Sequence, residues 1–313
     1  MKINNKKRCN KSWKETVVKD FRKNKVVYAM ILIPFLYYVF FKFVPMYGVV
    51  IAFKDYRPRL GINGSDWVGF KHFIRFLSLP SCGQLIFNTL RISLTSIIFA
   101  FPAPIILALL FNEISNKKFA KITQTITYMP HFISLVVVCG MITSFTLDTG
   151  IIPQILSFFG FEPKTLLAYA EYFIPIYVIS DIWQNVGWGS IIYIAALTGI
   201  DPGLYEAAQI DGANRWKQTL HVTLPGIAPT IITLLILRVG GVLSVGFEKI
   251  ILLYNDANIS VADVISTYVY RKGLLEQSWS FSSAVGIMNS VINFVLLVAV
   301  NKLSKKINDT SLW

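Results

Sequence analysis

The chain has 313 residues, of which 54% are hydrophobic and only 15% are charged. Soluble domains are nearer one quarter charged, so this composition and its long uncharged runs exclude an ordinary soluble domain and indicate a bilayer protein. The net charge of +13 does not indicate nucleic-acid binding, because ten of the 30 Lys and Arg lie in residues 1–25 and no basic groove with interleaved aromatics follows. Three cysteines and three histidines are scattered along the chain, which argues against a disulfide framework or a metal site.

The first expected membrane span covers residues 26–53 and follows a basic tail, residues 1–25. A helix of that length would reach about 42 Å, more than the bilayer core of about 30 Å, so its outer end should project beyond the lipid. Pro34 and Pro45 should kink it. With the polar stretch that follows, it forms a first segment, 26–84.

The segment 85–304 carries the other expected spans, and 305–313 is a C-terminal tail. Apolar length predicts spans at about 86–111, 122–145, 173–198, 226–252 and 282–301. The loop 146–172 contains Gly and Pro and can hold a short interfacial helix, and 253–281 reads as a long outer loop. The sequence therefore predicts an all-α membrane protein with six transmembrane helices.

The distribution of positive charge predicts the orientation of these spans. Three Lys lie in 112–121, two basic residues in 199–225 and three in 302–313, in addition to the ten of the tail. The other three loops together hold eight basic residues. Because basic residues gather on the cytoplasmic side, both termini and the 201–225 loop are expected in the cytoplasm.

The loop 201–225 is the longest polar stretch with a helical pattern between two apolar segments. Asp201 is a plausible N-cap before Pro202, which suits the first helical position. Gly212 can take a positive φ and end the helix. A second short helix is expected from Asn214 to about Val222, with Leu224-Pro225 ending it. The loop thus predicts a helix–glycine–helix pair.

The same loop resembles the EAA loop of binding-protein-dependent ABC importer permeases. The pattern is EAA, a glycine a few residues later, and an apolar-Leu-Pro end. The residues that carry it are Glu206, Ala207, Ala208, Asp211, Gly212, Ala213, Leu224 and Pro225. The segments NTLRISLTSIIFAFPAPIILALLFNEI at 88–114, TYMPHFIS at 127–134 and ADVISTYVYRKGL at 262–274 are similar to the branch that serves oligo- and polysaccharide importers.

The resemblance implies the type I ABC importer permease fold in a bacterial cytoplasmic membrane. It implies a heterodimer with a second homologous permease, two cytoplasmic ATPase subunits that carry ATP and Mg, and an extracytoplasmic solute-binding protein. The 201–225 loop would be the coupling helix: Glu206 would orient it, Ala207 and Ala208 would pack in a groove of the ATPase, and Gly212 would make the turn.

The chain contains no G-x-x-x-x-G-K-[ST] sequence and no nucleophile–base pattern, so it is not expected to be an enzyme or to carry a cofactor of its own. Intramembrane polar residues are the other signal, because such groups are costly against lipid. They are the candidate solute path: Asp181, Gln184, Asn185, Trp188 and Arg238. The alternative is that Asp181 and Arg238 pair to hold helices together, with the two amides as interhelical contacts.

Other functions stay open at this point. A permease for amino acids or phosphate is the nearest alternative. A proton- or sodium-driven secondary transporter would be expected to show inverted repeats, and no repeat is seen. A scaffold without transport would not need the polar stripe.

Overall fold

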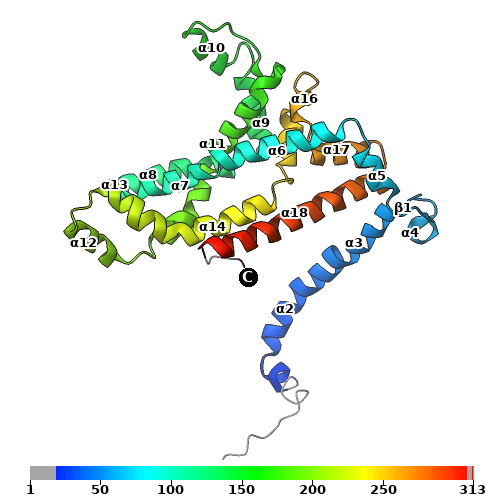
Figure 1. Ribbon diagram of the computed structural model, residues 1–313, viewed down its shortest axis with the longest axis horizontal. Helices are drawn as coiled ribbons and strands as arrows, with labels where there is room; N and C mark the ends of the chain where they lie inside the picture. The colour runs from blue at the N-terminus through cyan, green and yellow to red at the C-terminus, as the bar shows by residue number, and fades with distance from the viewer. Residues whose placement is uncertain (1–18, 309–311, 313) are drawn as a thin grey trace, which may run out of the picture.

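The computed structural model describes residues 19–308 and Leu312. An N-terminal helical arm runs without interruption from Lys25 to Phe53. Figure 1 shows this arm extending away from the rest of the molecule, and none of its apolar window is buried against the chain. Its parts are α2 (Lys25–Tyr38), a π-turn (Val39–Phe43), α3 (Val44–Met46) and a 3₁₀ turn (Tyr47–Phe53). The arm matches the predicted first span.

A small cap follows the arm at one end of the molecule. Strand β1 (Lys54–Asp55) pairs antiparallel with β2 (Asp66–Trp67), and the short helix α4 (Gly61–Gly64) lies between them. Phe53 stacks on Trp67 with 5.7 Å between ring centroids. Helix α5 (Lys71–Leu77) then packs against the last helix, α18 (Trp279–Asn308). The cap fixes where the arm leaves the bundle.

The bundle consists of long apolar helices. Four helical stretches are long and apolar enough to cross a membrane, or five if one sharply bent pair counts as one span. They are the arm, α6–α7 (Cys82–Phe99 and Pro102–Asn112), the stretch Arg215–Gly240 and α18; the bent pair is Lys117–Phe132 with Leu135–Phe145. Helix α11 (Ala170–Leu197) is also long enough at 28 residues, and its polar stripe reduces its apolarity.

The predicted third span, 122–145, is wrong as a single helix. Helix α8 (Lys117–Tyr128) continues into a 3₁₀ turn (Met129–Phe132), and α9 (Leu135–Phe145) leaves at 96° to it. The physical reason is local. Pro130 supplies no N–H to the helix, and Ile133 and Ser134 are extended, so the chain changes direction before α9 begins.

The predicted end of a helix at Leu224-Pro225 is also wrong. Helix α13 (Arg215–Gln218), a π-turn (Thr219–Thr223) and α14 (Leu224–Gly240) form one continuous helix. In the π-turn the N–H of Leu224 donates to the carbonyl of Thr219, one residue further back than in an α-helix. This wider turn accommodates Pro225, and the same arrangement precedes Pro45 in the arm.

The predicted fifth span, 226–252, is interrupted near its outer end. Helix α14 ends at Gly240, residues 241–246 are not helical, and α15 covers Phe247–Leu253. Asn293 of α18 satisfies part of the freed polar groups: its amide oxygen accepts the N–H of Leu243 at 3.1 Å, and its amide nitrogen donates to the Ser244 hydroxyl at 2.9 Å. Non-helical backbone inside a membrane protein needs hydrogen-bond partners of this kind, because it has no helical ones.

The remaining segments are helical as well. The loop 146–172 holds the expected short helix, α10 (Ile151–Ser157), and a 3₁₀ turn (Leu166–Ala168), and Figure 1 shows α10 projecting from the bundle. The predicted outer loop 253–281 folds into α16 (Ile259–Ala262), α17 (Ile265–Tyr270) and a π-turn (Arg271–Leu275). Helix α17 is largely buried and contacts α6, α15 and α18. The loop is therefore part of the packed body.

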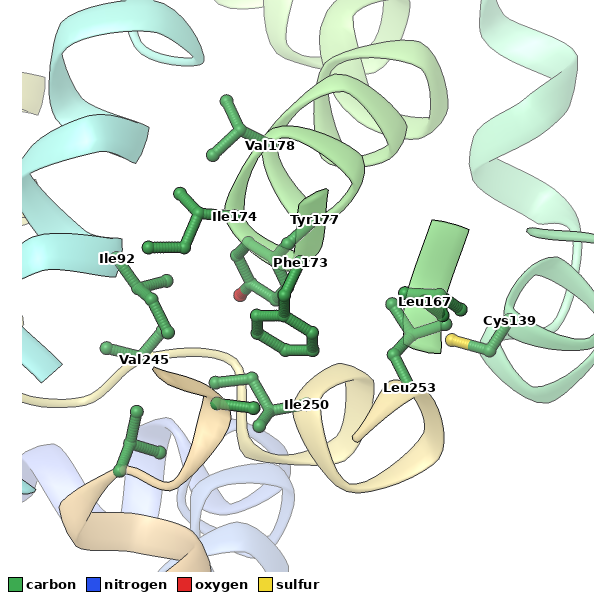
Figure 2. Close-up of a cluster of buried hydrophobic side chains, with 12 residues drawn as sticks. Ile92, Cys139, Leu167, Phe173, Ile174, Tyr177, Val178, Val245, Ile250 and Leu253 are labelled. Carbon is green, nitrogen blue, oxygen red and sulfur yellow. The ribbon is translucent and has the colours of Figure 1, made fainter. Parts of the chain in front are cut away.

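A buried apolar cluster joins these pieces around the outer half of α11. Figure 2 shows the rings of Phe173 and Tyr177 beside Ile250 of α15, with Ile92 of α6 and Cys139 of α9 on either side. Phe173 and Ile250 are fully buried. The cluster fixes α11 relative to both interrupted helices, which positions the polar residues described next.

Candidate functional site

The loop between α11 and α13 holds helix α12 (Pro202–Ile210), whose ends are formed as the sequence predicts. The Asp201 carboxylate accepts the N–H of Gly203 at 2.9 Å. At the other end Gly212 has φ +75°. The N–H of Ala213 donates to the Ala208 carbonyl at 2.8 Å, and that of Gly212 to the Gln209 carbonyl at 3.0 Å. These two bonds form a Schellman motif, so the predicted helix–glycine turn is confirmed.

Helix α12 and the start of α13 present an exposed apolar surface. Leu204, Ile210 and Trp216 are 53%, 86% and 71% exposed, and Glu206 and Ala207 are exposed beside them. Figure 1 shows α12 at the end of the bundle opposite the cap. Large apolar side chains this exposed outside the bundle are typical of a protein–protein contact.

Three contacts attach this loop to the bundle. The Tyr205 hydroxyl lies 3.0 Å from the Thr223 hydroxyl in the π-turn, and Arg215 pairs with Glu113 at 3.1 Å. The ion pair is exposed and contributes little stability. Gly226 allows the closest approach: a Cβ there would lie 2.9 Å from the side chain of Ile200, at the end of α11. Displacement of α12 would therefore reach both α11 and α14.

The polar stripe of α11 meets the break between α8 and α9. The Asn185 amide donates to the Asp181 carboxylate at 3.0 Å, and its amide oxygen lies 3.0 Å from His131 Nδ1. The His131 ring stacks on Trp188, with centroids 4.7 Å apart and planes 3° from parallel. Gln184, 6% exposed, donates to the Ile133 carbonyl at 3.4 Å. The polar stripe of α11 thus supplies hydrogen-bond partners to His131 and Ile133 at the bend.

His131 was missed as a site residue by the sequence reasoning, although a signal was present. A histidine directly after Pro130, with the N-cap residue type Ser134 three positions on, marks a helix break with a polar group at it. Gln184 and Trp188 lie at this break, in keeping with the alternative of interhelical contacts. Their assignment to a solute path stays a prediction.

Two cavities lie one above the other along α11, between α6–α7 and α14. The first has a volume of about 280 Å³ and is lined by Ser96, Tyr177 and Gly246 among others; the second has about 480 Å³ and is lined by Pro104, Asn185 and Gly189 among others. Asp181, Leu237 and Arg238 line both. Asp181, Leu237 and Arg238 therefore form a waist between the two cavities.

Asp181 and Arg238 do not pair directly within the described part of the chain. No nitrogen of Arg238 comes within the 4.0 Å limit of an ion pair with Asp181. The alternative in which these two residues hold helices together as an ion pair is therefore wrong. Both instead line the same two cavities, from α11 and from α14.

Lys249 of α15 lies behind the first cavity. It is 4% exposed, its Nζ donates to the Tyr177 carbonyl at 3.1 Å, and it lies 5.0 Å from the centre of the Tyr177 ring. This burial excludes an exposed interfacial anchor. The residue instead attaches the segment after the 241–246 break to α11.

An outer ion pair outside the predicted spans stabilises the segment before α17. Arg271 contacts the Asp263 carboxylate with both terminal nitrogens, at 2.6 and 3.3 Å, and Thr267 donates to the same carboxylate at 2.8 Å. The hydrogen bond to Asp263 raises the pKa of Arg271. The Asn88 amide of α6 donates to the Asp263 carbonyl at 2.9 Å. This hydrogen bond connects the segment before α17 to the bundle.

Comparison with known proteins agrees with this architecture. A family model described as "Binding-protein-dependent transport system inner membrane component" matches residues 100–309. The chain is 44% identical to the polygalacturonan/rhamnogalacturonan transport system permease protein YteP of Bacillus subtilis, over 93% of this chain and 91% of that one. It is 42% identical to protein LplB of the same organism, over 93% and 92%.

Among solved structures, a chain of a bacterial ABC transporter involved in the import of the acidic polysaccharide alginate is similar with a TM-score of 0.86 and 42% identity, over 94% of this chain and 99% of that chain. The predicted fold of a type I ABC importer permease is thereby confirmed, and the secondary-transporter alternative is set aside. The chain belongs to the family of binding-protein-dependent transport system inner membrane components.

Proposed function

We propose that this chain is the membrane-spanning subunit of an ATP-driven importer that takes up oligosaccharides or polysaccharide fragments delivered by a solute-binding protein. The observation that carries the proposal is the likeness along almost the whole chain to a chain of the alginate transporter. The relatives support the same solute class, since one is named for polygalacturonan and rhamnogalacturonan. A related transporter has been solved in complex with a periplasmic protein bound to an alginate pentasaccharide.

The partners follow from what this chain lacks and what it exposes. The chain has no phosphate-cradling loop, so ATP and Mg belong on two cytoplasmic ATPase subunits. The exposed apolar surface of α12 is the contact for one of them, with Glu206, Ala207 and Ala208 at its centre. A second, homologous permease completes the membrane part as a heterodimer. The end of α18 lies toward the α12 end of the bundle, in keeping with a cytoplasmic C-terminus.

The proposed mechanism is alternating access. Closure of the ATPase dimer displaces α12, and the displacement passes through Tyr205, Thr223 and the Gly226–Ile200 contact into α14 and α11. These two helices line the cavities on both sides of the waist, so their movement opens one side and closes the other. Solute would pass along Asp181, Asn185 and Arg238.

The test is reconstitution. The tagged chain is purified in mild detergent with the subunits that co-purify and is placed in liposomes with its solute-binding protein. Oligosaccharide should stimulate ATP hydrolysis and accumulate inside. A chain that purifies alone even after crosslinking at 201–225, or a complex that responds to an amino acid or phosphate and to no saccharide, would overturn the proposal.

A further inference from the structure

Arg238 has a guanidinium group without a partner among residues 19–308. It lines both cavities, and none of the side-chain hydrogen bonds or ion pairs of the described chain involves it. An arginine in a membrane protein is costly unless an anion or several acceptors meet its five donors. The waist lies at the middle of α11 and beside the middle of α6–α7. Arg238 is exposed, so its donors are open to an anionic occupant of the cavity.

Other polar groups of the first cavity suit hydroxyl groups. Ser96 is 2% exposed, and its hydroxyl has no hydrogen-bond partner in the described chain. Tyr177 presents its phenol there, accepting a backbone hydrogen bond from Gly246 and keeping its own O–H free to donate. Asp181 supplies an acceptor. A buried, unpaired hydroxyl beside a guanidinium is costly in an empty cavity, which points to a ligand that satisfies both.

We propose that Arg238 binds the carboxylate of a uronic acid residue as the saccharide crosses the waist, and that this contact makes the route selective for anionic over neutral saccharides. This inference rests on the proposed import function. A bidentate guanidinium–carboxylate contact is the strong form of such recognition, and Ser96, Tyr177 and Asp181 take the hydroxyl groups. Asp181 also opposes the bound carboxylate. It thereby keeps the anion from being held too tightly to leave, as conduction requires.

The experiment compares two saccharides with the same sugar rings, one with free carboxylates and one with neutral methyl esters. The probes are a galacturonic acid trisaccharide and its fully methyl-esterified form, taken up by liposomes that contain the complete complex and its solute-binding protein. Uptake by each variant is divided by uptake by the unaltered complex, which cancels the preference of the binding protein. The variants are Arg238→Gln and Arg238→Lys. Arg91→Gln is the matched control, because Arg91 is an exposed arginine of α6 that lines neither cavity.

Arg238→Gln should lower uptake of the charged trisaccharide roughly tenfold or more and leave uptake of the ester within about twofold, the range expected for losing a charge-assisted contact. Arg238→Lys should keep part of the preference, and Arg91→Gln should change neither uptake. An equal loss of both uptakes in an assembled Arg238→Gln complex would overturn the inference, since it would assign the arginine to a contact with the second permease. No uptake of either probe by the unaltered complex would instead count against the proposed function.

Discussion

At the scale of single residues, Gly212 is one of four glycines with a positive φ in the described part of the chain, and it is the one that ends α12. Its φ is +75°, and a Cβ there would meet nothing within 4 Å, so the restriction is conformational and not a matter of space. For L-residues the left-handed conformation costs roughly 1–2 kcal/mol, more for a β-branched side chain and least for asparagine. The turn after α12 therefore depends on this glycine.

Replacing Gly212 by valine is expected to uncouple transport while leaving the protein in the membrane. The Schellman bonds of α12 would be lost, and the surface at Glu206 and Ala207 would turn away from its partner. The measurement is saccharide-stimulated ATP hydrolysis of the reconstituted complex, with membrane yield as a check on insertion. Gly212→Asn is the matched control and should keep most of the stimulation. Normal uptake by the valine variant would contradict the prediction.

His131 joins the α8–α9 break to α11 by two separable contacts. His131→Phe keeps the stack on Trp188 and loses the bond to Asn185, whereas His131→Ala loses both. Each contact is worth about 1 kcal/mol, so the alanine variant should melt at a lower temperature than the phenylalanine variant, which should melt below the unaltered protein. Thermal unfolding in detergent, followed by the monodisperse fraction, gives the order. Equal melting of both variants would mean that the stack contributes nothing.

At the scale of elements, the break at 241–246 is held by a contact that tolerates no side chain. A Cβ on Gly246 would lie 2.7 Å from the Tyr177 hydroxyl and 3.9 Å from the next ring atom. Only the hydroxyl oxygen is in the way. Because Tyr177 lies in the buried cluster of Figure 2, the ring cannot move aside easily.

Gly246→Ala is therefore expected to destabilise the protein by about 1–3 kcal/mol through overpacking. Tyr177→Phe removes the obstructing oxygen, so the double variant Gly246→Ala/Tyr177→Phe should be more stable than Gly246→Ala alone. A double-mutant cycle on melting temperatures measures this coupling. Additive losses in the cycle would show that the two residues do not interact in the way described.

The two interrupted helices also show where sequence reasoning reached its limit. Length and apolarity predicted where the spans lie, and Asp201, Pro202 and Gly212 predicted the ends of α12. Proline was the ambiguous signal: Pro130 precedes a 96° bend, whereas Pro225 lies inside a continuous helix after a π-turn. The prolines themselves do not separate these outcomes, although His131 and Ser134 after Pro130 mark the bend. The partners at the two interruptions, Gln184 and Asn185 at the α8–α9 break and Asn293 at the 241–246 break, come from helices distant in the sequence.

The sequence predicted the polar stripe of the candidate site but did not predict which of its residues face a cavity. The stripe on α11 followed from helical spacing, but which residues face a cavity depended on the placement of α6–α7 and α14. That placement put Asp181, Asn185 and Arg238 at cavities and Gln184 and Trp188 at the α8–α9 break. The burial of Lys249 could not be predicted from the sequence, because it results from the 241–246 break, which the apolar run concealed.

At the scale of the whole molecule, α12 and the end of α10 are two distant projections that both carry exposed apolar side chains. Ile210→Asp should abolish capture of the ATPase subunits by the tagged chain, because a charge would be buried in the docked surface. Phe158→Asp is the matched control: Phe158 is 88% exposed at the other projection, and its replacement should leave ATPase capture unchanged. Quantitative co-purification makes the comparison. Full capture by the Ile210 variant would place the docking surface elsewhere.

The uninterrupted helix from Arg215 to Gly240 has a mechanical consequence. At 1.5 Å per residue, about 35 Å of rigid rod connect the end of the α12 loop to the guanidinium of Arg238. The π-turn at 219–223 interrupts the regular α-helical hydrogen bonding of the rod, and the Tyr205–Thr223 contact lies on it. In the proposed mechanism, a push on α12 would act near the π-turn, and a small displacement at that end of the helix would become a larger movement of Arg238 at the waist.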